Sequence, residues 1–213
     1  MDIGLFCGVF DPIHLGHLHI INAVKNKIDL NEIWVLPNYI PPHKSSPQAS
    51  FQDRYTMIQM AITDIFLAYE KPYIRCVTLE EIIQPYPNYT INTIKYIKDL
   101  TQAELFLIMG SDEWNNFPTW YKVDQICQLC QIVVVKRYHT ELIDHENFSY
   151  IFADYMTENI SSSGIRKQLQ AASLGEIPCG LTQSVWKFIQ ENTGRGQAAI
   201  HRVLSTSSIK KKK

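Results

Sequence analysis

The chain has 213 residues, of which 46% are hydrophobic and 19% are charged, and its formal net charge at pH 7 is −1. This length and composition fit one globular domain and exclude an intrinsically disordered chain. The near-neutral charge gives no overall basic surface for a nucleic acid, so we expect the partners to be small anions.

Membrane insertion and disulfide bonding are both disfavoured by the sequence. No apolar stretch approaches the roughly 20 residues that cross a bilayer, and no secretory signal pattern opens the chain. The five cysteines are scattered and odd in number, which is typical of a reduced protein. We therefore predict a cytoplasmic protein without membrane partners, and the sequence leaves open whether it forms an oligomer.

Apolar runs typical of strands alternate along the chain with segments of helical period. In the first half we expect strands at Ile3–Cys7, Asn31–Pro37 and Tyr73–Val77, and helices at Leu15–Lys25, Phe51–Ile65 and Thr90–Leu100. In the second half we expect strands at Ala103–Gly110, Ile132–Val135 and Tyr150–Ala153, and helices at Val123–Leu129, behind Ser161–Ser163 and at Thr182–Gln190.

This alternation predicts an α/β fold, in which right-handed crossovers build a parallel sheet with helices on both faces. The pattern stops near Asn192, and the chain ends in four lysines. We therefore assign residues 1–191 to one domain and residues 192–213 to a flexible C-terminal extension.

The segment Gly8–His17, GVFDPIHLGH, follows the first strand and opens the first helix. Backbone N–H groups and the positive end of the helix dipole collect at such a helix start, which suits a phosphate. His14 and His17 lie one helical turn apart and can face the same ligand. Half of a zinc site is the alternative, but the sequence has no nearby third ligand, so we predict no protein-bound metal. The pair Cys127 and Cys130 is interpreted as core cysteines for the same reason.

Other polar motifs also follow strands, so they should meet at the carboxyl edge of the sheet. Each has a structural alternative. Lys44 could be a solvated loop lysine, Arg166 a surface arginine, and Asp112 a helix cap instead of a ligand of ribose or Mg²⁺. Trp120 and Tyr121 could be a core pair or an aromatic wall for a planar ring. Neither a Walker motif nor a Gly-x-Gly-x-x-Gly fingerprint is present.

Taken together, several motifs resemble a known family. Gly8–His17 and Ile160–Arg166 resemble the two signatures of the nucleotidyltransferase superfamily. Further motifs narrow the resemblance to the bacterial nicotinate-nucleotide adenylyltransferases: Pro41–Lys44, Asn88–Thr93, Gly110–Asp112, Trp120-Tyr121 and Val133–Arg137. The match runs from Ile3 to about Gln190 and implies a single Rossmann-like nucleotidyltransferase domain.

The resemblance implies a reaction in which ATP and nicotinate mononucleotide, with Mg²⁺, give deamido-NAD and pyrophosphate. Its catalytic residues would be His14, His17, Lys44 and Arg166. ATP would also contact Gly8, Val9, Phe10, Ser162, Ser163, Gly164 and Ile165. The second substrate would contact Asn38, Thr90, Gly110, Asp112, Trp120, Tyr121 and Arg137.

Physical chemistry supports such a reaction without a covalent intermediate, because the attacking group is already a phosphate oxygen. Catalysis then requires aligning two polyanions and stabilising charge, for which cationic imidazole, guanidinium, ammonium and Mg²⁺ are suited. Alternatives are an adenylyltransferase acting on nicotinamide mononucleotide or phosphopantetheine, and a non-catalytic nucleotide-binding regulator. The chain departs from the family pattern at Cys7, at Val9 and at the helical Gly164.

Overall fold

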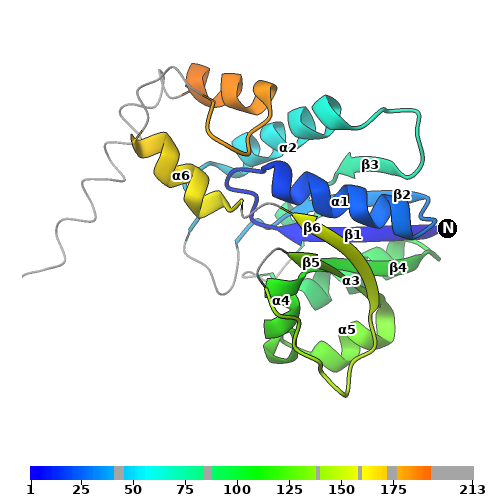
Figure 1. The fold of residues 1–213 in the computed structure, drawn as a ribbon. Helices are drawn as coiled ribbons and strands as arrows, with labels where there is room; N and C mark the ends of the chain where they lie inside the picture. The colour runs from blue at the N-terminus through cyan, green and yellow to red at the C-terminus, as the bar shows by residue number, and fades with distance from the viewer. Residues whose placement is uncertain (41–45, 84–87, 138–139, 158–159, 172–176, 193–213) are drawn as a thin grey trace, which may run out of the picture.

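Six parallel strands form one sheet in the order β3-β2-β1-β4-β5-β6 (Figure 1). The structure is a computed structural model that describes residues 1–40, 46–83, 88–137, 140–157, 160–171 and 177–192. The strands are β1 (Asp2–Gly8), β2 (Glu32–Pro37), β3 (Tyr73–Cys76), β4 (Glu104–Gly110), β5 (Gln131–Arg137) and β6 (Ile151–Thr157). Every neighbouring pair is parallel, so the predicted α/β fold is confirmed.

Helices lie between most successive strands, and others follow the last strand. They are α1 (Leu15–Lys27), α2 (Phe51–Ile65), α3 (Thr90–Leu100), α4 (Ser111–Asn116), α5 (Val123–Leu129) and α6 (Ser162–Ala171), with short 3-10 turns η1 (Leu79–Glu81) and η2 (Phe117–Thr119). Residues 183–192 are also helical. The sequence did not predict α4, because six residues are too few to show a helical period. Among the described residues, no helix is long and apolar enough to span a membrane.

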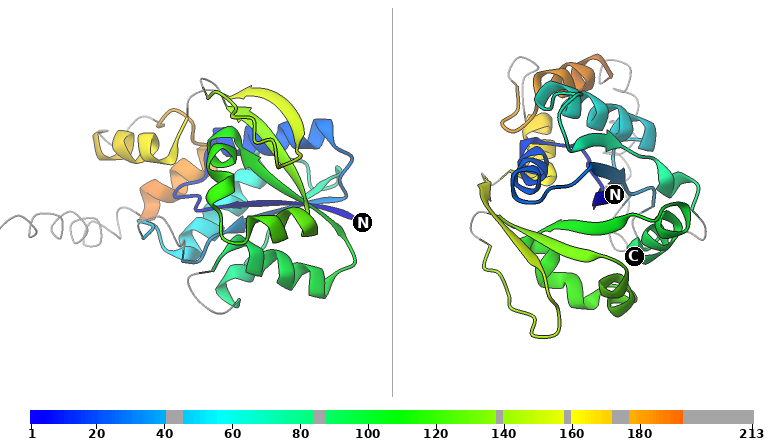
Figure 2. Two further views of the ribbon diagram at one scale, coloured as in Figure 1. Left: turned by 90° about the horizontal axis from the view of Figure 1, so that it is seen from below. Right: turned by 90° about the vertical axis from the view of Figure 1, so that its right-hand side faces the viewer.

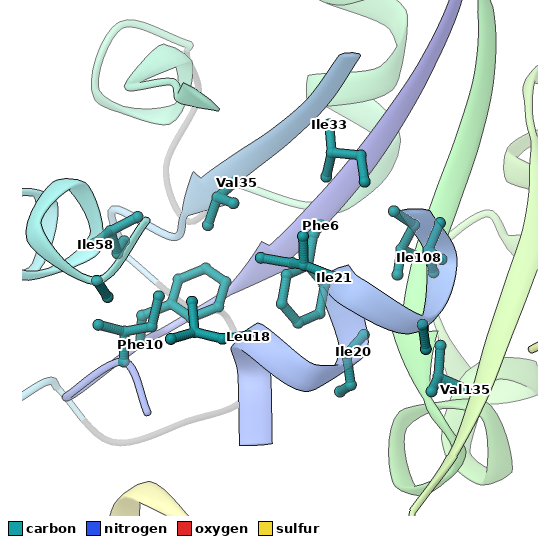
Figure 3. Close-up of a cluster of buried hydrophobic side chains, with 14 of the residues drawn as sticks. Phe6, Phe10, Leu18, Ile20, Ile21, Ile33, Val35, Ile58, Ile108 and Val135 are labelled. Atoms are coloured by element: carbon teal, nitrogen blue, oxygen red, sulfur yellow. The ribbon is translucent and has the colours of Figure 1, made fainter. Parts of the chain in front are cut away.

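Helices cover both faces of the sheet, as the two views in Figure 2 show. α1, α2 and α6 contribute to the hydrophobic cluster on one face, and α3, α4 and α5 contribute to the cluster on the other. Each inner strand serves both clusters, because alternate side chains point to opposite faces. In β1, Phe6 belongs to the first cluster and Leu5 to the second. Figure 3 shows the first cluster, to which Phe10, Leu18 of α1 and Ile58 of α2 belong.

β1 lies in the middle of the sheet and pairs with β2 on one side and with β4 on the other. Strands β1 to β3 are added toward one edge of the sheet and strands β4 to β6 toward the other, so the order of the strands reverses between β1 and β4. Ligands of open parallel sheets bind at such a reversal, beyond the carboxyl ends of the strands. The described polar residues that follow β1, β2, β4 and β6 lie toward this edge, on the left of Figure 1. The fold therefore locates the site at the ends of β1 and β4. Lys44 and residues 193–213 of the predicted extension lie outside the described residues.

Candidate active site

Two cavities, of about 300 and 510 Å³, adjoin at the carboxyl ends of β1 and β4. Cys7 and Gly8 at the end of β1 line both of them, as do Gly110 at the end of β4 and Glu113 in α4. Two ligands bound in the two cavities would therefore meet at this shared wall. The arrangement suits a reaction between two substrates.

The larger cavity, which we call the histidine cavity, is lined by His14, His17, Ser161–Ser163 and Arg166, together with Asp112. The smaller one, which we call the aromatic cavity, is lined by Asn38, Tyr89, Thr90, Trp120 and Tyr121. The histidine cavity thus carries both histidines, the arginine and three adjacent serines, and the aromatic cavity carries Tyr89, Trp120 and Tyr121.

His14 and His17 form a stacked pair at the start of α1. Their ring centroids lie 3.7 Å apart, and the ring planes are inclined by 25°. The backbone N–H of His14 donates to Nδ1 of His17 over 3.3 Å. This hydrogen bond requires Nδ1 to be unprotonated, so the ring proton of His17 belongs on Nε2. The geometry therefore favours a neutral imidazole that donates from Nε2, in place of the cationic imidazole that the sequence analysis expected.

Phe10 supports His17 from another side. Its backbone has a φ of 52°, an uncommon conformation for a residue other than glycine, and its ring is only 2% exposed. The ring meets that of His17 edge-on, with the centroids 4.9 Å apart, and meets Phe6 in the same manner at 5.4 Å. Strained backbone of this kind persists where the surroundings impose it, often at functional sites. The position of His17 is thus set by core packing.

The zinc alternative finds no further ligands. Within the part of the chain that the structure describes, no group of three or more His, Cys, Asp or Glu could hold a metal ion. Cys130 is buried in the second hydrophobic cluster, and Cys127 packs against it. The interpretation of both as core cysteines is confirmed.

Three polar contacts join α6 to the loop between β1 and α1. Ser162 Oγ donates to the Pro12 carbonyl over 3.0 Å, and Arg166 Nη1 donates to the Asp11 carbonyl over 2.6 Å. Arg166 Nη1 also lies 3.8 Å from Asp11 Oδ2. The Asp11 carboxylate in turn accepts hydrogen bonds from the backbone N–H groups of Gln48 and Ala49. These contacts hold the guanidinium of Arg166 at the wall of the histidine cavity.

The start of α1 differs from the sequence-based expectation of unpaired N–H groups. The Leu15 N–H donates to the Gly180 carbonyl over 2.8 Å, and the His17 N–H donates to the His14 carbonyl over 2.9 Å. The long separation between Leu15 and Gly180 hid the first of these bonds from the sequence. A phosphate at this helix start would therefore depend more on side chains than the sequence suggested.

The aromatic cavity has a wall of rings and a helix N-terminus. The ring of Tyr121 lies 4.7 Å from that of Tyr89, and Trp120 meets the buried ring of Phe117 edge-on at 5.4 Å. Trp120 is thus partly supported by the core and partly presented to the cavity. Tyr89 and Thr90 begin α3, whose first turn contains no acidic residue. The positive end of the α3 dipole therefore lies at this cavity, which Glu113 also lines.

A buried carboxylate lies behind this wall. Glu80 is 1% exposed and accepts hydrogen bonds from Asn38 Nδ2 at 3.1 Å, from Thr93 Oγ1 at 3.2 Å and from the Tyr39 N–H at 3.3 Å. Burial raises the pKa of Glu80, while these hydrogen bonds and the Arg54 guanidinium act in the opposite direction. Asn88 Nδ2 donates to Thr93 Oγ1 and so connects the start of α3 to the same group.

Cys7 lines both cavities with a thiol that stays protonated. Burial raises the pKa of Cys7 well above its usual value, and the charges of Glu80 and Cys130 act in the same direction. Because the thiolate is the reactive form of cysteine, this shift makes Cys7 a poor nucleophile. Cys7, where the sequence departs from the family pattern, therefore adds a small neutral side chain to the shared wall.

We expect Cys7 to react with iodoacetamide at neutral pH at least about ten times more slowly than Cys179, because each unit of pKa elevation removes about nine-tenths of the thiolate. Cys179 is exposed and serves as the internal control. Peptide mapping by mass spectrometry during a labelling time course measures both rates. Equal rates in the folded protein would contradict the burial of the Cys7 thiol; in urea the two should become similar.

Comparison with known proteins identifies the family. The model of the cytidylyltransferase-like family matches residues 5–168. The nicotinate-nucleotide adenylyltransferase of Bacillus subtilis (strain 168) is 33% identical over 193 residues, covering 89% of this chain and 96% of that protein. The chain belongs to the nicotinate-nucleotide adenylyltransferases. A probable family member from Shewanella sediminis (strain HAW-EB3) is 37% identical over 214 residues, covering 91% of this chain and 97% of that protein.

A solved structure of the family shares the fold. The Plasmodium falciparum nicotinic acid mononucleotide adenylyltransferase complexed with NaAD matches with a TM-score of 0.71 at 20% identity, covering 90% of this chain and 95% of that one. At this level of identity the likeness concerns the fold. The resemblance noted in the sequence to this family is therefore confirmed by the relatives and by the fold.

Most residues predicted to form the site of such an adenylyltransferase line the two cavities. The histidine cavity includes Gly8, Val9, Phe10, His14, His17, Gly110, Asp112, Ser162, Ser163 and Arg166. The aromatic cavity includes Gly8, Asn38, Thr90, Gly110, Trp120 and Tyr121. Asp112 lies in the first turn of α4, where Gly110 occupies the cap position, so the capping alternative for Asp112 is wrong.

Of the remaining four predicted residues, two line neither cavity, and the side chains of the other two lie outside what the structure describes. Gly164 lies inside α6, and its N–H donates to Ser161 Oγ. Ile165 is 1% exposed in the first hydrophobic cluster, and its N–H donates to the Ser161 carbonyl, so its side chain belongs to the core. Arg137 ends β5, but its side chain lies outside what the structure describes, as does Lys44.

The sequence analysis missed Glu113, Arg54 and Glu80. Glu113 lies in the first turn of α4, directly after the predicted Asp112, and lines both cavities. An acidic residue after a buried strand was the available signal for it. Arg54 and Glu80 gave no such signal, because their partners are distant in the sequence and only the fold brings them together.

Proposed function

We propose that this protein transfers the adenylyl group of ATP to nicotinate mononucleotide, producing deamido-NAD and pyrophosphate. A phosphate oxygen of the mononucleotide forms a bond to the α-phosphorus of ATP, and the bond from that phosphorus to the pyrophosphate breaks. The observation that carries the proposal is the wall shared by the histidine cavity, which holds Arg166, and the aromatic cavity. A direct displacement requires two bound nucleotides to meet in this way.

In this proposal, the ATP phosphates occupy the histidine cavity. His14, His17 and Arg166 would contact them, together with Lys44, and the hydroxyls of Ser162 and Ser163 would add donors. Support comes from the fixed positions of these groups: His17 is held between two rings, and Arg166 is bound to the Asp11 carbonyl. Preorganised donors stabilise charge that develops in a transition state more strongly than mobile ones.

The pyridine ring of nicotinate mononucleotide would lie in the aromatic cavity between Trp120, Tyr121 and Thr90, with Asn38, Gly110 and Arg137 as further contacts. Its carboxylate would lie near the start of α3, where the helix dipole is positive and no acidic residue occurs in the first turn. Because Glu113 also lines this cavity, the choice of nicotinate over nicotinamide is supported mainly by the similarity to the nicotinate-nucleotide adenylyltransferases.

Mg²⁺ is the metal that fits this site. Magnesium ions at nucleotide sites usually bind substrate phosphates and one or two carboxylates, and Asp112 and Glu113 both line the histidine cavity. These two carboxylates would hold the ion together with ATP. When bound, the ion would supply positive charge to the phosphates. Because Asp112 lines this cavity, it could also contact a ribose there, which is the other role that the sequence analysis proposed for it.

Pyrophosphate release from ATP and Mg²⁺ tests the proposed function, with nicotinate mononucleotide, nicotinamide mononucleotide and phosphopantetheine supplied in parallel. We expect the highest kcat/KM with nicotinate mononucleotide. Turnover with phosphopantetheine alone would favour the sister activity. Binding of ATP without turnover of any acceptor would favour a nucleotide-binding regulator, and either result would refute the proposal.

Trp120→Ala should raise KM for nicotinate mononucleotide about tenfold with a smaller change in kcat, because stacking on an aromatic side chain is worth about 1–3 kcal/mol. Steady-state kinetics at saturating ATP measure both constants. Tyr69→Ala is the matched control, since this aromatic residue is 76% exposed and lines neither cavity. An unchanged KM in Trp120→Ala would remove Trp120 from the ring site.

A further inference from the structure

Arg54 is a buried arginine in α2 that binds the backbone ends of two neighbouring strands. Its side chain is 1% exposed, and Nη1 donates to the Val9 carbonyl and to the Asn38 carbonyl, each over 2.8 Å. Val9 follows β1 and lines the histidine cavity, whereas Asn38 follows β2 and lines the aromatic cavity. A single guanidinium therefore joins one loop from each cavity.

Asn38 is held through its backbone carbonyl, its backbone N–H and its side-chain NH₂ group. Its carbonyl accepts from Arg54, its N–H donates to the Gly8 carbonyl over 2.8 Å, and its side-chain amide donates to both carboxylate oxygens of Glu80. Glu80 in turn accepts a hydrogen bond from Thr93 Oγ1 in α3. A hydrogen-bonded chain thus runs from the loop of the histidine cavity to the helix that borders the aromatic cavity.

Keeping two charged groups in the interior is costly, which argues that their geometry matters. Burial lowers the pKa of Arg54, while the nearby carboxylates of Asp11 and Glu80 raise it. Apolar side chains in place of both charged groups would avoid this desolvation penalty, and such joint replacements of buried ion pairs are often neutral or stabilising. An apolar side chain could not, however, donate to two carbonyls at once.

We propose that Arg54 and Glu80 are positioning residues that fix the histidine cavity relative to the aromatic cavity through Asn38 and Val9. The attacking phosphate of one substrate is then aligned with the α-phosphorus of ATP at the shared wall. The proposal rests on the proposed adenylyl transfer. It predicts that loosening either residue leaves each substrate bound in its own cavity but misaligned with the other, and misalignment lowers the rate of the chemical step.

The test compares Arg54→Met, Arg54→Lys and Glu80→Gln with the wild type. For each, kcat, both KM values and the Kd for ATP alone are measured well below the temperature of unfolding, and the melting temperature is determined separately. Arg75→Met is the matched control, because Arg75 is an exposed arginine of β3 that pairs with Glu32 outside both cavities. Glu80→Gln preserves the side-chain shape and keeps the test decisive if Arg54→Met does not fold.

We expect kcat to fall at least tenfold in Arg54→Met and Glu80→Gln, while KM and the Kd for ATP stay within about threefold of wild type. Arg54→Lys restores a donor and should recover part of kcat. A kcat within twofold of wild type in either folded variant, with only the melting temperature lowered, would show a purely structural role and overturn the proposal. A rise in the Kd for ATP that accounts for the whole loss would overturn it too. Inactivity of the wild type with nicotinate mononucleotide would instead refute the proposed function.

Discussion

His17→Ala is expected to lower kcat about 100- to 1,000-fold while changing KM for ATP much less. In the structure Nδ1 of His17 accepts a hydrogen bond from the His14 N–H, so Nε2 carries the proton. A donor of this kind gains strength as negative charge develops on the phosphates in the transition state, and loss of one preorganised donor typically costs this much in kcat. Rapid-quench measurement of a single turnover would separate this step from product release.

His19→Ala is the matched control for this prediction. It removes an imidazole from the same helix, and His19 is not among the residues lining either cavity. We expect its kcat to stay within a few fold of wild type. If His17→Ala raised KM for ATP and left kcat unchanged, His17 would contribute equally to ground-state and transition-state binding, and its proposed role in the chemical step would be wrong.

The sheet was predictable because its signals are local. Apolar runs such as Leu105–Met109 require burial on both faces, and only a parallel sheet covered by helices supplies that burial. The turn residues between β1 and α1 marked the start of the first helix equally clearly. By contrast, the six-residue α4 was missed, because the aromatic side chain of Trp114 and the core around it decide its conformation.

The candidate site was only partly predictable, for a related reason. Residues that follow strands could be assigned to one edge of the sheet from topology alone, which brought His14, Asp112 and Arg166 together. Arg54 and Glu80 could not be found in this way, because each acts through carbonyl or amide groups that the fold brings from other segments. The protonation of His17 was also inaccessible, since it depends on one backbone hydrogen bond rather than on residue type.

Gly16→Ala should lower kcat about a hundredfold although it removes no polar group. Gly16 lies in the first turn of α1, where alanine is favoured over glycine by about 1 kcal/mol. A Cβ at this position, however, would lie 3.0 Å from Nδ1 and 3.1 Å from Cε1 of His14. His14 is 2% exposed and stacks on His17, so its ring cannot move away without displacing its partner. Small displacements of catalytic groups can cost this much in rate.

The opposing effects of Gly16→Ala on stability and activity make the experiment discriminating. Overpacking costs about 1–3 kcal/mol and the gain in helix propensity offsets part of it, so the melting temperature should fall only slightly while kcat falls strongly. Asn26→Ala, on the exposed end of the same helix, should change neither quantity appreciably. Normal kcat in Gly16→Ala would mean that the histidine pair tolerates displacement, and the rigid stacking of His14 on His17 would then not be required for transfer.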